Sequence, residues 1–246
     1  MLVILTSPAV AIAQTDKTVS VAVAACGELI DAVNASPTKP PRLSDPGTQK
    51  LFRLVLPEIA ASGPPAGVGE FATLSELSLQ AGRLARAYIL AGTGVGEGTA
   101  ESDPLSPRQR EWARGNFLTF LPEIAMAYDF RIRVAARLAA GAAEFNERAA
   151  QKANQDPAVR GGLKAIASEV ETIIAAALSL VADDNIEDHW RLERMDLLSR
   201  NAPSYAAFLD TKPSQILADQ ALSAAIHENN PAIGKLLKEF ALAILR

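Results

Sequence analysis

Two glutamates in a repeated motif are the residues of this chain most suited to chemistry. Residues 52–60 read FRLVLPEIA and residues 117–125 read FLTFLPEIA, so Glu58 and Glu123 occupy the same position in the pattern F-x-x-x-L-P-E-I-A. If the two segments pack across a pseudo-twofold axis, their carboxylates meet. Two carboxylates at close range share a proton or bind a cation. The repeat therefore suggests a paired carboxylate site.

A structural role explains the same two glutamates. Proline at the first position of a helix costs little, whereas proline inside a helix removes a hydrogen-bond donor and clashes with the preceding turn. Pro57 and Pro122 therefore mark either a helix start or a kink. At a helix start, Glu58 and Glu123 lie in the first turn, where the helix dipole stabilises a carboxylate by about 0.3–1 kcal/mol.

A cluster of arginines is the second candidate binding site. Arg108, Arg110 and Arg114 follow a serine-proline pair that is typical of a helix start, and Trp112 lies among them. Guanidinium groups beside an aromatic ring bind carboxylates, phosphates or an acidic protein surface through paired hydrogen bonds. A solvated helix face has the same composition. Three further arginines follow the second LPEIA segment: Arg131, Arg133 and Arg137.

The densest polar stretch, residues 183–194 with the sequence DDNIEDHWRLER, is better explained as a helix start than as a metal site. Asp184 or Asn185 would cap the helix, and the following carboxylates would occupy its positive first turn. The alternating glycines at 92–98 lack a phosphate-loop lysine, and no G-x-S-x-G motif is present. We therefore predict no metal site and no cofactor.

Helices must position these residues. Apolar residues recur every three or four positions along nearly the whole chain, and no segment alternates long enough to indicate a strand. The clearest stripes cover 74–91, 159–181 after Asp156-Pro157, and 233–244 after Asn230-Pro231. We predict an all-α fold of roughly eight or nine helices, arranged as a helical bundle or an irregular α-array.

Two segments interrupt the helical pattern. Residues 34–46 and 92–107 are rich in proline, glycine, serine and aspartate, which favour exposed connections over helix interiors. Each helical segment beside them has one apolar face that needs a partner. We therefore predict a single compact domain over residues 14–246, with mobile connections at these two places.

The composition excludes some classes of protein. Hydrophobic residues make up 49% of the 246 residues, and the net charge of −4 does not provide the basic surface that nucleic-acid binding requires. A single cysteine excludes an internal disulfide. The longest apolar run after residue 14, residues 173–182, is about half of a membrane-spanning helix. We therefore expect no transmembrane segment in the mature chain.

The N-terminus resembles an export signal. Residues 1–14, MLVILTSPAVAIAQ, are apolar and end in the small-x-small pattern that signal peptidase cleaves, which predicts cleavage after Ala13 and a periplasmic or secreted protein. The small residues before Cys26 leave open a lipid anchor at that cysteine, and a cytoplasmic location is the third alternative. Helical spacing with Val19 and Ile30 favours instead a buried Cys26.

The sequence contains many apolar residues at helical spacing, and it contains few reactive side chains at the spacing of a known catalytic motif. We therefore expect an exported helical protein that acts by binding another component of the cell envelope. A bundle that encloses a small apolar ligand is the alternative, because many alanines and few aromatic residues leave gaps between helices. An enzyme that uses carboxylates alone is the third possibility, and the sequence does not specify the oligomeric state.

Overall fold

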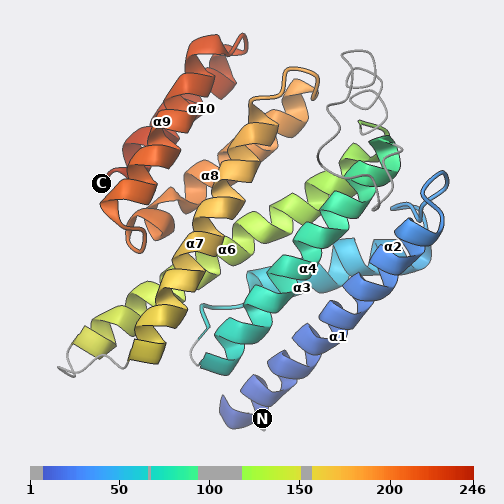
Figure 1. The fold of residues 1–246 in the computed structure, drawn as a ribbon, viewed down its shortest axis with the longest axis horizontal. Coiled ribbons are helices and arrows are strands. Elements are labelled where there is room, and N and C mark those ends of the chain that lie inside the picture. The colour runs from blue at the N-terminus through green and yellow to red at the C-terminus, as the bar shows by residue number, and fades with distance from the viewer. Residues whose placement is uncertain (1–7, 66–67, 94–117, 151–156) are drawn as a thin grey trace, which may run out of the picture.

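The prediction of an all-α fold is confirmed. A computed structural model describes residues 8–65, 68–93, 118–150 and 157–246, and every regular element in these ranges is a helix (Figure 1). In chain order they are α1 (Pro8–Ala35), α2 (Pro46–Lys50), the π-helix η1 (Leu51–Val55), α3 (Leu56–Ala61), α4 (Val68–Thr93), the 3₁₀ helix η2 (Leu118–Phe120), α6 (Leu121–Ala150), α7 (Pro157–Val181), α8 (Asp188–Ala206), α9 (Thr211–His227) and α10 (Pro231–Ile244).

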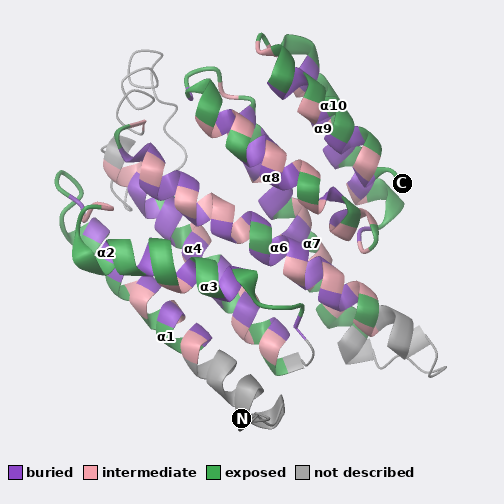
Figure 2. Cartoon of the chain, turned by 180° about the vertical axis from the view of Figure 1, so that it is seen from behind, coloured by how far each residue is buried: buried purple, intermediate pink, exposed green. Residues whose placement is uncertain are grey.

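The long helix α6 is the centre of the fold. It packs against α4 on one side and against α7 and α8 on the other. Helix α1 lies along the outer side of α4. At the opposite end of the molecule α10 packs on α8, and α9 packs on α10 and α7 (Figure 1). Buried apolar residues from α1 to α10 form one connected cluster, and Figure 2 shows these buried positions along the helices.

Proline and asparagine set several helix starts as predicted. Helix α7 begins at Pro157 and α10 begins at Pro231. The side chain of Asn230 caps α10 by accepting hydrogen bonds from the backbone N–H groups of Ala232 and Ile233, at 2.9 and 3.4 Å. Helix α4 contains the predicted apolar stripe and continues to Thr93.

The repeated LPEIA segments both start an α-helix. Pro57 is the second residue of α3 and Pro122 is the second residue of α6. Glu58 and Glu123 accordingly lie in the first turns of these helices, as the structural explanation predicted.

A π-helical turn accommodates Pro57. Helices α2, η1 and α3 follow one another without a break, so Pro57 lies within a continuous helical rod. Its ring cannot donate to the preceding turn and would clash with the carbonyl of Arg53 in a regular α-helix. The wider π turn, in which Leu56 N–H donates to the carbonyl of Leu51, comes immediately before the proline.

Helix α8 begins later than predicted. Its N-cap is Glu187, not Asp184 or Asn185, and Asp188 is the acidic residue of the first turn. The reason is a local turn, because the Asp183 carboxylate accepts hydrogen bonds from the backbone and side-chain N–H groups of Asn185, at 3.0 and 2.6 Å. Aspartate commonly stabilises such turns at the expense of helix.

Helix α1 is the apolar N-terminal helix. Within the described residues, Thr18–Ala35 is the one stretch long and apolar enough to cross a membrane, with a mean hydropathy of 1.3. Glu28 and Asp31 interrupt the apolar sequence of this stretch, so it is not visible as an uninterrupted apolar run. Such a helix near the N-terminus is compatible with a signal sequence. One face packs on α4 and contains Val19, Ala22, Cys26, Leu29 and Val33.

Candidate functional site

The two repeated glutamates lie in different environments. Glu123 is 1% exposed, and its Oε1 accepts hydrogen bonds from Arg42 Nε and the backbone N–H of Leu43, at 2.9 and 3.0 Å. Glu58 is exposed at the start of α3. The structure thus joins Glu123 to Arg42, and the paired carboxylate site stays a prediction.

Arg42 holds the connection between α1 and α2 against the body of the fold. Its Nη2 donates to the carbonyl of Thr119 at 2.9 Å, and its guanidinium lies 5.0 Å from the centre of the Phe120 ring. The Tyr88 hydroxyl donates to the carbonyl of Pro41 at 2.7 Å. Burial raises the pKa of Tyr88, and the nearby Glu123 carboxylate raises it further. These contacts give Glu123 a structural partner 81 residues away in the sequence.

The predicted arginine site Arg108, Arg110, Trp112 and Arg114 lies outside the described residues. The three arginines of α6 have separate surroundings. Arg133 is exposed, whereas Arg137 donates to the carbonyls of Ile59 and Gly63 and so closes the C-terminus of α3. Arg131 is half-buried between α4 and α7. These three side chains do not form one basic surface.

Two buried arginines give the polar stretch at 183–194 a structural role. Arg191 is 4% exposed and donates to the carbonyl of Val181 at 2.7 Å and to Asp188 Oδ1 at 3.0 Å, and it pairs with Glu228. Arg194 donates to Asp129 at 2.8 Å. No group of three potential ligands suited to a metal ion occurs among the described residues.

A pocket of about 230 Å³ opens between α4, α6 and α7. Helices α4 and α7 both pack along α6 and make few contacts with each other, which leaves a gap above α6. Small residues on both helices, Ala72 on α4 and Gly162 on α7, keep the gap open. The remaining lining residues are Phe71, Ser75, Phe145, Leu163 and Ile166.

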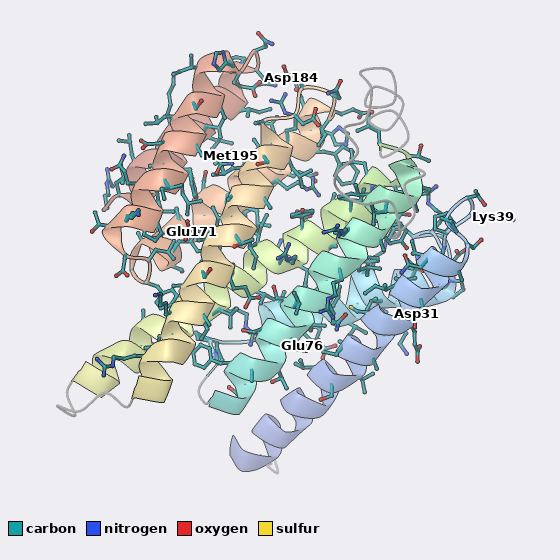
Figure 3. All side chains as sticks on the ribbon, viewed as in Figure 1. Asp31, Lys39, Glu76, Glu171, Asp184 and Met195 are labelled. Carbon is teal, nitrogen blue, oxygen red and sulfur yellow. The ribbon has the colours of Figure 1, made fainter. Side chains whose placement is uncertain are left out.

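Two serines and a glycine continue the face of α4 on which the pocket residue Phe71 lies. Ser75, Ser78 and Gly82 lie three or four residues apart and so share one face of the helix with Phe71. Ser78 is completely buried. A Cβ atom at Gly82 would lie 3.0 Å from Arg131 Cζ, so the glycine lets the guanidinium lie directly on α4. Figure 3 shows Glu76, the exposed neighbour of Ser75, on the same helix.

Glu169 lies on α7, one helical turn after Ile166. Its carboxylate is opposite in charge to the Arg131 guanidinium. Burial raises the pKa of Glu169, while the Ser78 and Ser75 hydroxyls and the Arg131 guanidinium lower it. Burial also lowers the pKa of Arg131, and the Glu169 charge counteracts that effect after Tyr128 does. Each of these two side chains therefore influences the pKa of the other.

Three atoms of this cluster are buried without a hydrogen-bond partner among the described residues. They are Ser78 Oγ, Arg131 Nε and Glu169 Oε1, one from each of α4, α6 and α7, although the Ser78 hydroxyl lies near enough to Glu169 to lower the pKa of that carboxyl. Buried polar atoms almost always bind a partner, which can be an ordered water molecule or a ligand. A concave, largely apolar pocket is the usual form of a small-molecule site. We define Ser78, Arg131 and Glu169 as the polar cluster; none of the three lines the pocket.

Replacing Glu169 with Gln tests the electrostatics of this cluster. Because burial raises the pKa of Glu169, the folded state binds a proton more readily than the unfolded state does. The contribution of Glu169 to the free energy of unfolding is therefore present at acidic pH. It is lost as the pH rises through the pKa that Glu169 has in the folded state. Urea denaturation should show E169Q to be more stable than wild type at pH 8, with the difference vanishing near pH 4. A difference that is equal at both pH values would contradict this assignment.

The sequence contained one signal for the polar cluster that the predictions missed. Ser78 lies on the buried face of α4 between Leu74, Leu77 and Ala81, where helical spacing predicts an apolar residue. A serine at a core position indicates a local polar partner. Arg131 was grouped with Arg133 and Arg137 as part of a candidate basic cluster or a solvated helix face, and Glu169 lies in an amphipathic helix where its partners on α4 could not be foreseen.

Comparison with known protein families, with curated proteins and with solved structures finds no match to this chain.

Proposed function

We propose that this protein binds a small, largely apolar molecule in the pocket between α4, α6 and α7. The observation that carries the proposal is an open pocket between three helices that is lined almost entirely by apolar side chains. The gap arises from small side chains between the helices. A helical bundle with such a pocket is the kind of ligand-binding protein that the alanine-rich composition suggested.

The size of the pocket limits the ligand. A dry apolar cavity of about 150 Å³ holds benzene, so a volume of about 230 Å³ suits an apolar body of roughly six to nine non-hydrogen atoms. The two phenylalanines of the lining, Phe71 and Phe145, favour an aromatic or branched apolar body. Toluene is therefore a suitable first probe.

Filling the pocket should abolish binding. We expect toluene to bind the wild-type protein, as measured by ligand-observed NMR, and to lose at least about tenfold in affinity in Ile166→Trp, because the larger ring occupies the space of the ligand. Ile216→Trp is the matched control, since Ile216 is 48% exposed on α9. It should bind toluene as the wild type does. Binding that is absent in the wild type, or retained in Ile166→Trp, would refute the proposal.

We further propose that the protein acts in the periplasm or outside the cell. Cleavage after Ala13 would leave intact the buried face of α1, which begins at Val19 in the described side chains. A lipid anchor at Cys26 would instead remove Val19 and Ala22 from the core. Intact mass of the protein from its native host tests this location, and a mature chain that begins at Met1 would contradict export.

A further inference from the structure

A second and longer groove lies between α1 and the continuous helical rod of α2, η1 and α3. The chain reverses direction between them, and α1 packs extensively on α4 but makes few contacts with the rod (Figure 1). This arrangement leaves a groove of about 570 Å³. Along α1 it extends from Val21 to Ala32, which is about 16 Å at the rise of an α-helix. The groove shares no lining residue with the pocket between α4, α6 and α7.

The half of the groove beside the N-terminal part of α1 is apolar. Val21 and Ala25 lie one turn apart and line it from α1, while Val55 lines it from η1. Val21 is 60% exposed. Covering exposed apolar side chains removes them from water, and an exposed apolar patch often marks a binding surface. A narrow, elongated apolar surface of this kind suits an alkyl chain.

Charged side chains line the other half of the groove. Glu28 comes from α1, and Asp45 and Lys50 come from the beginning of the rod. Within the described part of the chain, the side chains of Glu28 and Lys50 make neither a hydrogen bond nor an ion pair. The Asp45 carboxylate accepts one hydrogen bond, from the backbone N–H of Arg42 at 2.8 Å. The two walls thus present opposite charges that do not neutralise each other directly.

Thr48 adds a hydroxyl to the charged half. The residue is 3% exposed and lines the groove, and its hydroxyl has no hydrogen-bond partner among the described residues. Buried polar groups almost always have a partner, which can be water or a ligand. A hydroxyl can donate to an anionic oxygen, and the Lys50 ammonium group can do the same. An anionic group therefore suits the wall of Thr48 and Lys50, and a cationic group suits the wall of Glu28.

We infer that the groove between α1 and α2 binds a zwitterionic amphiphile, which is a single alkyl chain attached to a head group with one anionic and one cationic part. The alkyl chain lies along Val21, Ala25 and Val55, and the head group lies between Glu28 and Lys50. Since a cavity of about 150 Å³ holds benzene, the groove has room for roughly twenty non-hydrogen atoms. A decyl chain with a phosphocholine head group has this size.

Decylphosphocholine at submicellar concentration is the test probe, and isothermal titration and ligand-observed NMR measure its binding to the full chain. We expect it to bind at least about fivefold more tightly than decyl maltoside, decyltrimethylammonium or decyl sulfate, because each of these lacks at least one of the two charges. Glycerophosphocholine, which has no alkyl chain, should bind at least about a hundredfold more weakly.

Two results would overturn the inference. If decyl maltoside binds as tightly as decylphosphocholine, the groove does not select a zwitterionic head group. If the protein floats with phosphatidylcholine vesicles but does not bind monomeric decylphosphocholine, it attaches to a membrane surface and does not take up a single amphiphile.

Charge variants assign the preference to the two walls. Glu28→Gln and Lys50→Gln should each weaken decylphosphocholine binding about threefold and leave decyl maltoside binding unchanged. Asp31→Asn on α1 and Arg53→Gln on η1 are the matched controls, because both residues are exposed and neither lines the groove; Asp31 is labelled in Figure 3. These two variants should bind decylphosphocholine as the wild type does.

Filling the apolar half tests the place of the alkyl chain. Ala25→Trp should weaken decylphosphocholine binding at least about tenfold, whereas Ala24→Trp, at an exposed position that does not line the groove, should bind normally. Ile166→Trp should also bind normally, so a failure of the pocket between α4, α6 and α7 can be distinguished from a failure of this groove. Binding that is unchanged in Ala25→Trp, Glu28→Gln and Lys50→Gln would refute the inference.

Discussion

Replacing Arg191 with Met is expected to lower the free energy of unfolding by about 3–5 kcal/mol. The guanidinium is 4% exposed and pairs with Glu228, whose side chain is 2% exposed. It also donates to Asp188 and to the carbonyl of Val181 at the end of α7. Without Arg191, the Glu228 carboxylate remains buried near α10 with no positive partner. Thermal denaturation should show a midpoint lowered by roughly 6–20 °C.

Two further variants separate this effect from a general loss of charge. Arg200→Met removes an exposed ion pair with Asp196 and should change stability by less than about 1 kcal/mol. In the double variant Arg191→Met/Glu228→Met, no buried charge is left alone, so part of the lost stability should return. A single variant Arg191→Met as stable as wild type, or a double variant less stable than the single one, would contradict the role of this ion pair.

Cys26 is expected to resist alkylation in the folded protein. The thiol is 0% exposed, and burial raises its pKa from 9.0 to about 12. At pH 8 the reactive thiolate should therefore be about a thousandfold scarcer than in an ordinary cysteine. Iodoacetamide labelling followed by mass spectrometry should show at least a thousandfold slower reaction in the native state than in urea.

A cysteine at a neighbouring exposed position supplies the control. Ala24 is exposed on the other side of α1, so Ala24→Cys in a Cys26→Ala background should label at the rate of a free thiol. Native Cys26 labelling within tenfold of that control would show that α1 separates from α4 in solution. The same result would remove the argument that Cys26 is a core residue.

Local sequence patterns determined where the helices of this protein lie in the chain. Apolar residues every three or four positions predicted helices, because one face of each helix must be buried. Proline and asparagine fixed helix starts, as at Pro157 and Asn230, because these residues satisfy or avoid the unpaired N–H groups of the first turn. These signals act over a few residues, so they are visible in the chain itself. The buried position of Cys26 followed from the same spacing.

Tertiary structure alone decided which polar groups meet. The sequence around Glu123 contains no sign of Arg42, which lies 81 residues away in the connection between α1 and α2 and donates a hydrogen bond to the Glu123 carboxylate. In the same way, Arg131 on α6 and Glu169 on α7 influence each other's pKa because α7 packs on α6. A helical pattern specifies which face is buried and not which neighbour covers it. The pocket and the polar cluster are therefore properties of helix packing, and the sequence by itself could supply only the small and polar residues from which they are built.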